Sequence, residues 1–173
     1  MKRLHLLRHA KSSWKDDVED RERALNRRGR EAARRVGHHL AKTIGPLDLV
    51  LCSSALRTRE TLELVLANFT NTPYSAIEGE LYAASQEQLM ERLHRLSEEE
   101  TNVLLIGHNP GLHELAIALA DNSSSHFNML AADKFPTGAC ASFEVASRWS
   151  ALAYSRNGLI GYVTPGALAG EKD

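Results

Sequence analysis

The chain has 173 residues, of which 43% are hydrophobic and 25% charged, and this length and composition predict one ordinary globular domain over residues 1–173. The formal net charge of −1 argues against a nucleic-acid-binding protein, because that role leaves an excess or a stripe of basic residues. No apolar run approaches the length of a membrane span, and the first ends at Arg8, too early for a signal peptide, so we expect a cytoplasmic protein without a membrane partner.

The first predicted element is a buried strand that begins at Leu4 and ends in the triplet Arg8-His9-Ala10. Side chains alternate along a strand, so Arg8 and His9 cannot both lie on one face of a continuing strand, and a turn is expected here. In open α/β sheets, ligands bind at this carboxyl end of the strands. The alternative is that Arg8 marks the solvent edge of the strand and His9 begins an ordinary polar loop.

The middle of the chain repeats this order of strand and helix. A helix is predicted over 28–42 and a second buried strand over 47–51. Ser53 and Ser54 follow that strand and could cap a helix that extends to about residue 67, which places Arg57 in its first turn. We expect a loop over 68–75 and a helix that opens with the capping box Ser85-x-x-Gln88 and ends near residue 96.

The last third of the chain contains one more such unit and then changes character. A third buried strand over 103–106 runs into Gly107-His108-Asn109-Pro110-Gly111, and a helix is predicted over 112–120. A polar loop over 121–126 follows. Two strands, over 139–145 and 149–154, are then expected to pair antiparallel near the edge of the sheet, because the short turn between them leaves no room for a helix.

These elements predict an α/β fold in three layers: a mostly parallel central sheet, helices on both faces, and an antiparallel strand pair toward the C-terminal edge. Parallel strands end at one edge of the sheet, so Arg8, His9, Arg57 and His108 are expected to converge there. Two guanidinium groups match the oxygens of a phosphoryl group, and a histidine can attack phosphorus and form a covalent intermediate. The sequence therefore predicts a phosphoryl-transfer site.

The motifs at these strand ends resemble those of the histidine phosphatase superfamily, which is also described as phosphoglycerate mutase-like. Three runs carry the resemblance: Leu6-Leu7-Arg8-His9-Ala10-Lys11-Ser12, Ser53-Ser54 with Arg57-Thr58 and Glu60-Thr61, and Gly107-His108-Asn109-Pro110-Gly111. The chain is similar to the small SixA-type phosphohistidine phosphatases in its Arg-His-Ala triplet and in three further stretches. These are Asp20-Arg21 to Leu25-Asn26 with Gly29, Leu81-Tyr82-Ala83-Ala84-Ser85, and Lys134-Phe135-Pro136-Thr137-Gly138.

The resemblance implies metal-independent hydrolysis of a phosphoryl group, without a cofactor, through a phosphohistidine intermediate on His9. Arg8, Arg57 and His108 would hold the phosphoryl oxygens. Lys11 and Ser12 would contact substrate, unless they are ordinary surface residues of the loop. Because His9 must be neutral to attack while His108 is more useful protonated, we expect their surroundings to push the two pKa values apart.

The resemblance also bears on the general acid and on the substrate. Glu80 is a candidate acid, and its alternative is a solvated loop carboxylate; phosphohistidine needs an acid less, because imidazole is a better leaving group than an alkoxide. Residues 68–85 are too few for a large lid, so the pocket is expected to be open. An open pocket suits a phosphohistidine-bearing protein, and a small phosphorylated molecule is the other partner considered. We expect a monomer, because no unusual apolar stripe is evident.

Four other functions are alternatives to a phosphohistidine phosphatase. A cysteine-dependent phosphatase needs five residues between its cysteine and arginine, and only four separate Cys52 from Arg57. Metal hydrolysis would need the helical spacing of a His-Glu-x-x-His motif, which His108 and His113 lack. A non-catalytic phosphate or phosphohistidine binding module remains, although it would not need His9. A small-molecule phosphatase or mutase of the same superfamily also remains.

Overall fold

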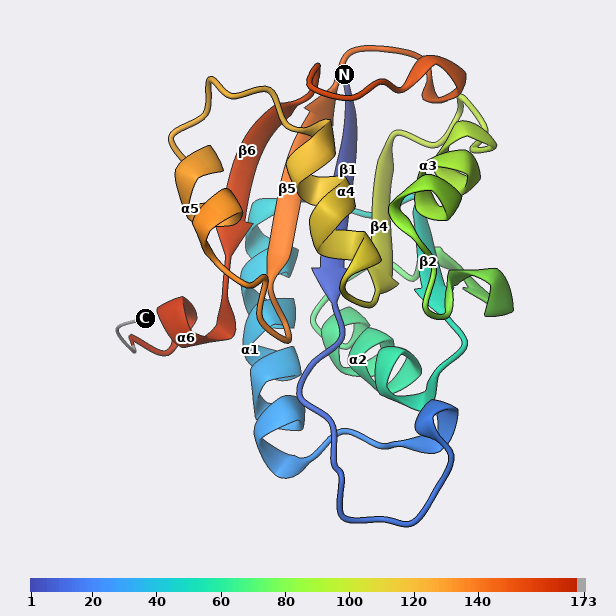
Figure 1. Ribbon diagram of the computed structural model, residues 1–173, viewed down its shortest axis with the longest axis vertical. Coiled ribbons are helices and arrows are strands. Elements are labelled where there is room, and N and C mark those ends of the chain that lie inside the picture. The colour runs from blue at the N-terminus through green and yellow to red at the C-terminus, as the bar shows by residue number, and fades with distance from the viewer. Residues whose placement is uncertain (171–173) are drawn as a thin grey trace.

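A computed structural model describes residues 1–170 and contains a six-stranded mixed sheet (Figure 1). The strands are β1 (Lys2–Arg8), β2 (Leu49–Ser53), β3 (Tyr74–Glu78), β4 (Asn102–Gly107), β5 (Cys140–Val145) and β6 (Gly158–Val163). Their order across the sheet is β3-β2-β4-β1-β5-β6. The first four run parallel to one another, whereas β5 runs antiparallel to both β1 and β6. Strand β1, which carries Arg8, therefore lies in the interior of the sheet.

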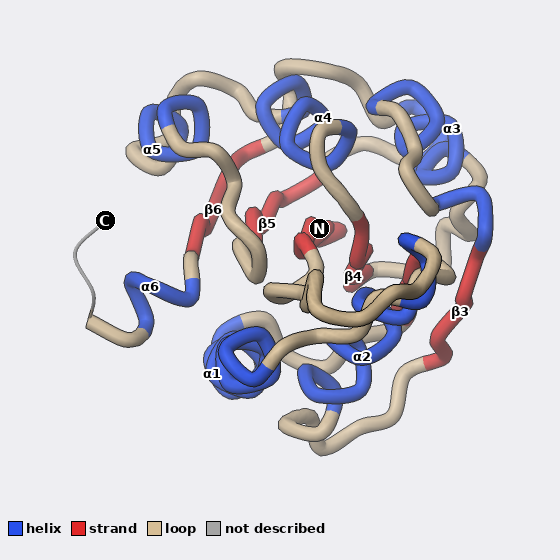
Figure 2. The backbone as a smooth tube through the Cα atoms, turned by 60° about the horizontal axis from the view of Figure 1, so that its bottom comes forward, coloured by secondary structure: helices blue, strands red, loops and turns tan. Residues whose placement is uncertain are grey.

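Helices cover both faces of this sheet. The helices are α1 (Arg27–Thr43), α2 (Leu56–Leu66), α3 (Gln86–His94), α4 (Gly111–Leu119), α5 (Phe127–Ala132) and the short α6 (Pro165–Leu168). Helices α1 and α2 lie on one face, and α3, α4 and α5 lie on the other (Figure 2). The predicted three-layer α/β fold, with its antiparallel pair at the C-terminal side, is thus confirmed. In the described part of the chain, no helix has the length and apolar character needed to cross a membrane.

The alternation of side chains along β1 divides the core into two layers. Leu4 and Leu6 are fully buried in the cluster beneath α3 and α4, whereas Leu7 is fully buried in the cluster beneath α1 and α2. His5 is also fully buried, and its ring bonds to Ser142 Oγ at 2.7 Å and to Asn102 Oδ1 at 2.8 Å. Both faces of β1 are therefore buried, which explains its nearly continuous apolar sequence.

The helix starts follow the local sequence in two cases and differ from the prediction in a third. Asn26 caps α1 by accepting from the backbone N–H of Gly29, and the predicted capping box of Ser85 and Gln88 is present at the start of α3. The prediction that serine oxygens cap α2 is wrong, because its cap residue is Ala55 and no side chain caps it. The hydroxyl of Thr58 instead donates to the carbonyl oxygen of Ala55 at 2.7 Å.

Three elements differ from the sequence prediction. Residues 74–78, predicted partly as loop, form the edge strand β3, whose half-exposed residues lack the apolar run that marks the buried strands. The strand predicted over 149–154 is wrong, because Trp149 begins a 3-10 turn there. The indole N–H of Trp149 donates to the carbonyl oxygen of Glu100 at 2.7 Å. The strand that pairs with β5 is β6 instead. Helix α5, a single short element after the polar loop, was not predicted.

The segment that leaves β1, residues 9–26, forms a long loop beyond the carboxyl ends of the parallel strands (Figure 1). Its two limbs pair, with the backbone N–H of Ser13 donating to Ala24 at 2.8 Å and that of Asn26 donating to Lys11 at 3.0 Å. Helix α1 presses against this loop at Gly29, where an added Cβ would lie 2.0 Å from the carbonyl oxygen of Lys11. This contact fixes Lys11 beside the end of β1.

Candidate active site

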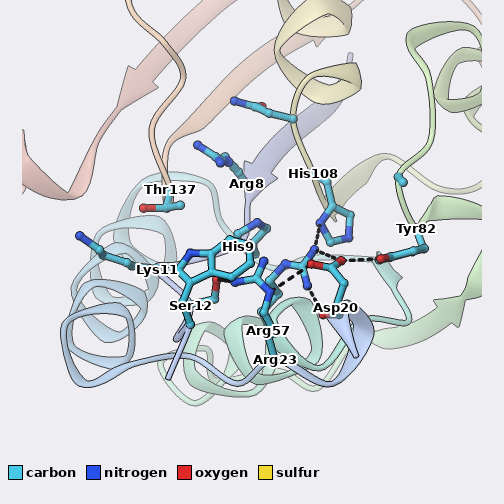
Figure 3. Close-up of a pocket in the computed structure, with 13 residues that line it drawn as sticks. Arg8, His9, Lys11, Ser12, Asp20, Arg23, Arg57, Tyr82, His108 and Thr137 are labelled. Carbon is cyan, nitrogen blue, oxygen red and sulfur yellow. Dashed lines mark hydrogen bonds and ion pairs between the residues drawn. The ribbon is translucent and has the colours of Figure 1, made fainter. Parts of the chain in front are cut away.

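A pocket of about 510 Å³ opens where β1, β2 and β4 end (Figure 3). It is lined by Arg8, His9, Lys11, Ser12, Trp14, Asp20, Arg23, Arg57, Tyr82, Ala83, His108, Asn109 and Thr137. The structure thus brings together the four residues predicted to converge, and the two candidate substrate contacts as well. Arg8 ends β1, Arg57 lies in the first turn of α2, and His108 directly follows β4.

His9 is buried, and one of its ring nitrogens is already bonded. Its Nδ1 lies 2.7 Å from the carbonyl oxygen of Ala10, which can only accept, so Nδ1 carries the proton. Burial lowers the pKa of His9 from 6.5 to about 3, and the charges of nearby cations add to this shift. The ring is therefore neutral near pH 7, and the lone pair of Nε2 is available to attack an electrophile.

Arg57 is held by an acidic residue from the β1–α1 loop. Its Nη1 donates to the carbonyl oxygen of Asp20 at 2.7 Å and its Nη2 to the carboxylate of Asp20 at 3.0 Å. The same carboxylate accepts from Tyr82 and from Arg23, the latter at 3.0 Å (Figure 3). The bond from Tyr82, with those from Arg23 and Arg57, holds the pKa of Asp20 well below its usual range. Asp20 is thus an ionised anchor for Arg57.

His108 lies between this anchor and His9. Its Nδ1 accepts from Arg57 Nη2 at 3.5 Å, and its Nε2 lies 2.7 Å from Ser53 Oγ. Burial, followed by the charge of Arg57, lowers the pKa of His108 to about 4. The expectation that the two histidine pKa values are pushed apart is therefore wrong: both fall, because both rings are buried among the same guanidinium groups.

Two buried donors in the pocket lack a partner. Among the residues that the structure describes, the Nε–H groups of Arg8 and Arg57 are buried and make no hydrogen bond. Arg8 Nη1 donates to the carbonyl oxygen of Phe135 at 3.2 Å. The pKa of Arg8 is lowered by burial and by the charge of Arg57. Buried unpaired donors on two mutually repelling cations are costly, and an anion bound in the pocket would offset the repulsion between the two guanidinium groups.

Glu80 lies outside the residues that line the pocket. Its carboxylate pairs with Arg95 at 2.8 Å and lies 3.6 Å from Arg92. The structure therefore does not bring this candidate acid to His9. Between residues 1 and 170, no cluster of three or more His, Cys, Asp or Glu side chains is arranged to hold a metal ion.

Sequence reasoning missed Asp20, Arg23 and Tyr82 as site residues. All three lie in stretches that carry the family resemblance, Asp20 and Arg23 within residues 20–26 and Tyr82 within 81–85, but the resemblance implied no role for them. One signal was available: Asp20 lies three residues before Arg23, in the loop that follows the strand ending in Arg8. This spacing could have suggested an ion pair at the carboxyl edge of the sheet. Nothing in the local sequence indicates that Tyr82, 62 residues later, reaches Asp20.

Cys52 provides a test of the thiol alternative. Its side chain is fully buried, and burial raises the pKa of the thiol to about 12, so the nucleophilic thiolate is not populated near pH 7. We expect Cys52→Ala to keep kcat within about two-fold of the wild-type value, since the change removes no group that lines the pocket. Steady-state kinetics measure this. A loss of kcat at unchanged thermal stability would mean that the Cys52 thiol takes part in catalysis.

The three buried histidines predict a pH dependence of stability. His5, His9 and His108 have pKa values of about 4, 3 and 4 in the folded protein, against 6.5 when unperturbed. Between about pH 4 and 6.5 the unfolded chain therefore binds more protons, so acidification lowers the free energy of unfolding, by about 2 kcal/mol per histidine from pH 7 to 5. Urea unfolding at pH 7 and pH 5 measures this; equal free energies would contradict the assigned neutral rings.

Comparison with known proteins places these residues in a family. Residues 4–79 match the model of the histidine phosphatase superfamily (branch 1). An uncharacterized protein of Mycobacterium tuberculosis is 33% identical over 162 residues, covering 92% of this chain and 99% of its own. A structure of a candidate phosphohistidine phosphatase SixA from Nakamurella multipartitia superposes with a TM-score of 0.82 at 26% identity, covering 95% of this chain and 96% of that one.

A second candidate SixA structure, from Agrobacterium tumefaciens, gives a TM-score of 0.79 at 27% identity and covers 95% of this chain and 98% of that one. These similarities extend over nearly the whole chain, from β1 through the C-terminal strands, and the matched family model includes both Arg8-His9 and Arg57. The chain belongs to branch 1 of the histidine phosphatase superfamily.

Proposed function

We propose that this protein is a phosphohistidine phosphatase that hydrolyses a phosphoryl group, carried on a histidine of another protein, through a phosphohistidine intermediate on His9. The observation that carries the proposal is the state of His9: a buried, neutral ring whose Nδ1–H is held by Ala10, beside two guanidinium groups with unpaired N–H donors. A nucleophile and an anion site of this kind are what phosphoryl transfer requires.

In the first step, His9 Nε2 attacks phosphorus on the side opposite the bond from phosphorus to the substrate nitrogen. A bond from Nε2 to phosphorus forms, the bond to the substrate breaks, and the substrate imidazole leaves with the electron pair and takes a proton from water. Arg8 and Arg57 donate to the oxygens, on which the transition state spreads its charge. As the phosphoryl group brings negative charge beside His108, the pKa of that ring rises from its low value, so that it can donate a proton to an oxygen.

In the second step, a water molecule attacks the phosphorus of phospho-His9. The bond from oxygen to phosphorus forms as the bond from Nε2 to phosphorus breaks, inorganic phosphate leaves, and His9 returns to its neutral form with Nδ1 bonded to Ala10. No carboxylic acid is needed for the proposed leaving group. Asp20 lines the pocket but stays ionised, because Tyr82, Arg23 and Arg57 hold its pKa down, so an alkyl phosphomonoester would find no carboxylic acid to protonate its alkoxide.

The rim of the pocket favours a substrate carried on a protein. Trp14 lines the pocket with 78% of its surface exposed, and the guanidinium of Arg23 stacks 3.5 Å from its ring centre. An exposed aromatic side chain at the mouth of a site is typical of a contact with a macromolecular partner. The family and the two SixA-like structures support the same reaction class.

The test follows phosphate release from a phosphohistidine-bearing protein and from phosphoramidate, both in excess chelator. We expect turnover of both substrates, undiminished by chelator, and little release from an alkyl phosphomonoester. Binding of inorganic phosphate without turnover of either nitrogen-linked substrate would instead support a binding module. Rapid hydrolysis of the phosphomonoester would favour a small-molecule phosphatase.

A further inference from the structure

A second groove, of about 290 Å³, adjoins the active-site pocket. Lys11 and Thr137 line both cavities, so the two cavities are neighbours near the end of β1. One wall of the groove is helix α1. Another wall is formed by Thr164 and the first residues of α6, a helix that packs against α1 (Figure 2). Nothing in the proposed reaction at His9 uses this space.

The wall formed by α1 is cationic. Arg28, Glu31, Ala32 and Arg35 line it, and this spacing of three and four residues places them on one face of the helix. The small side chain of Ala32 leaves the groove open between the two arginines. Within residues 1–170, neither arginine forms an ion pair: Glu31, the acid of this wall, pairs with Arg27 at 3.3 Å instead. In the described part of the chain, the groove therefore presents two guanidinium groups outside any ion pair, with the Glu31 carboxylate on the same wall.

The same cationic row continues along the helix. Lys42 is exposed and follows Arg35 by seven residues, as Arg35 follows Arg28, so the three side chains lie on nearly one face. At a rise of 1.5 Å per residue, Arg28 and Lys42 are separated by about 21 Å along the axis. This row of three cations contrasts with the formal net charge of the whole chain, which is −1. The row begins at the two arginines of the groove and extends along α1 to Lys42, which lies outside the groove itself.

We propose that this groove, with the row Arg28, Arg35 and Lys42, binds an acidic segment of the phosphoprotein whose phosphohistidine enters the pocket. The inference rests on the proposed function and narrows its substrate class to phosphoproteins with carboxylates near the phosphorylated histidine. Guanidinium groups bind carboxylates in a fork geometry, and a row of about 21 Å is longer than a single small phosphate ester can span. A polypeptide can span it.

A nucleic acid fits this surface less well. The groove walls contain no aromatic side chain on which a base could stack, and Glu31 would repel a continuous phosphate backbone. An acidic polypeptide can instead place a neutral or basic side chain opposite Glu31. Charge complementarity thus favours a protein segment as the occupant.

The experiment uses two peptides that each carry one phosphohistidine, flanked on both sides by four glutamates in one and four glutamines in the other. We expect the wild-type protein to prefer the glutamate peptide by about five-fold in kcat/KM at low salt, and the preference to shrink as salt is raised. The double variant Arg28→Gln/Arg35→Gln should lose most of this preference. Phosphoramidate, which is too small to reach the groove, provides the reference rate for each protein.

The control is Arg3→Gln/Arg34→Gln, which removes the same charge from two exposed arginines that neither line the groove nor pair with Glu31. It should keep the preference. An equal loss in both double variants, or no preference in the wild type, would overturn the proposal. So would binding of a single-stranded oligonucleotide that is tighter than that of the glutamate peptide and sensitive to Arg28→Gln/Arg35→Gln.

A second measurement separates this proposal from the proposed function. Fluorescence anisotropy of the two peptides without phosphate tests the groove without any turnover. If the wild type binds the unphosphorylated glutamate peptide in preference to the glutamine peptide but hydrolyses neither phosphopeptide, the phosphatase proposal fails and the groove assignment stands. If both phosphopeptides are hydrolysed equally and neither unphosphorylated peptide binds, the groove assignment fails alone.

Discussion

His9→Ala is expected to reduce turnover of phosphoramidate and of a phosphohistidine protein by at least about 10³-fold, because it removes the nucleophile of the proposed covalent intermediate. The change should barely alter the binding of phosphate, since Arg8, Arg57 and His108 remain. Phosphate release measures the rate. Samples quenched in base during turnover should contain an acid-labile phosphoprotein adduct for the wild type and none for His9→Ala.

The matched control is His38→Ala, which removes an exposed histidine from α1, on a part of the helix that does not line the pocket. It should leave both rate and adduct unchanged. A smaller variant sharpens the test: in His9→Gly, free imidazole should enter the vacated space, accept the phosphoryl group and restore part of the phosphate release. Turnover that survives in His9→Ala at the wild-type rate would contradict the assignment of the nucleophile.

The position of the site was predictable because it depends on topology and on few residues. Arg8 ends β1, His108 directly follows β4, and Arg57 lies in the first turn of the helix after β2, so the parallel arrangement of these strands brings Arg8, His9, Arg57 and His108 to one edge. Their convergence does not require knowledge of packing. For the same reason the central strands were found near their true bounds, whereas the exposed edge strand β3 was not.

The remaining features depend on contacts between distant segments. Tyr82 and Asp20 meet because the 9–26 loop folds back over the strand ends, which no local pattern specifies. The partner of β5 is β6 because the segment around Trp149 turns to bond Glu100 rather than pairing directly. The low pKa values of His9 and His108 follow from shared burial among cations. The sequence identifies these histidines, but their burial and the charges around them determine their protonation states.

Substitution of Arg57 is expected to have the second largest effect on catalysis. Its guanidinium group is held by Asp20, yet within residues 1–170 one of its N–H donors has no hydrogen-bond partner. Asp20 fixes two of its nitrogens, and its buried Nε–H has no partner. If Arg57 donates to the phosphoryl oxygens as proposed, Arg57→Ala should lower kcat/KM by about 10² to 10³-fold. Arg57→Lys keeps the charge but cannot reproduce the planar fork that spans Asp20 and the phosphoryl oxygens, so it should recover only about ten-fold of that loss.

The division of this loss between kcat and KM decides what Arg57 does. If the guanidinium held by Asp20 is matched to the charge of the transition state, kcat of Arg57→Ala should fall more than its KM rises. Asp20→Asn should show a weaker loss of the same kind, because the amide keeps the shape of the carboxylate but not its charge. Thermal unfolding of each variant controls for the buried cavity that Arg57→Ala creates. A rise in KM with kcat unchanged would mean that Arg57 binds substrate and transition state equally, and the organised network of Asp20, Arg23 and Tyr82 would then serve substrate affinity rather than the chemical step.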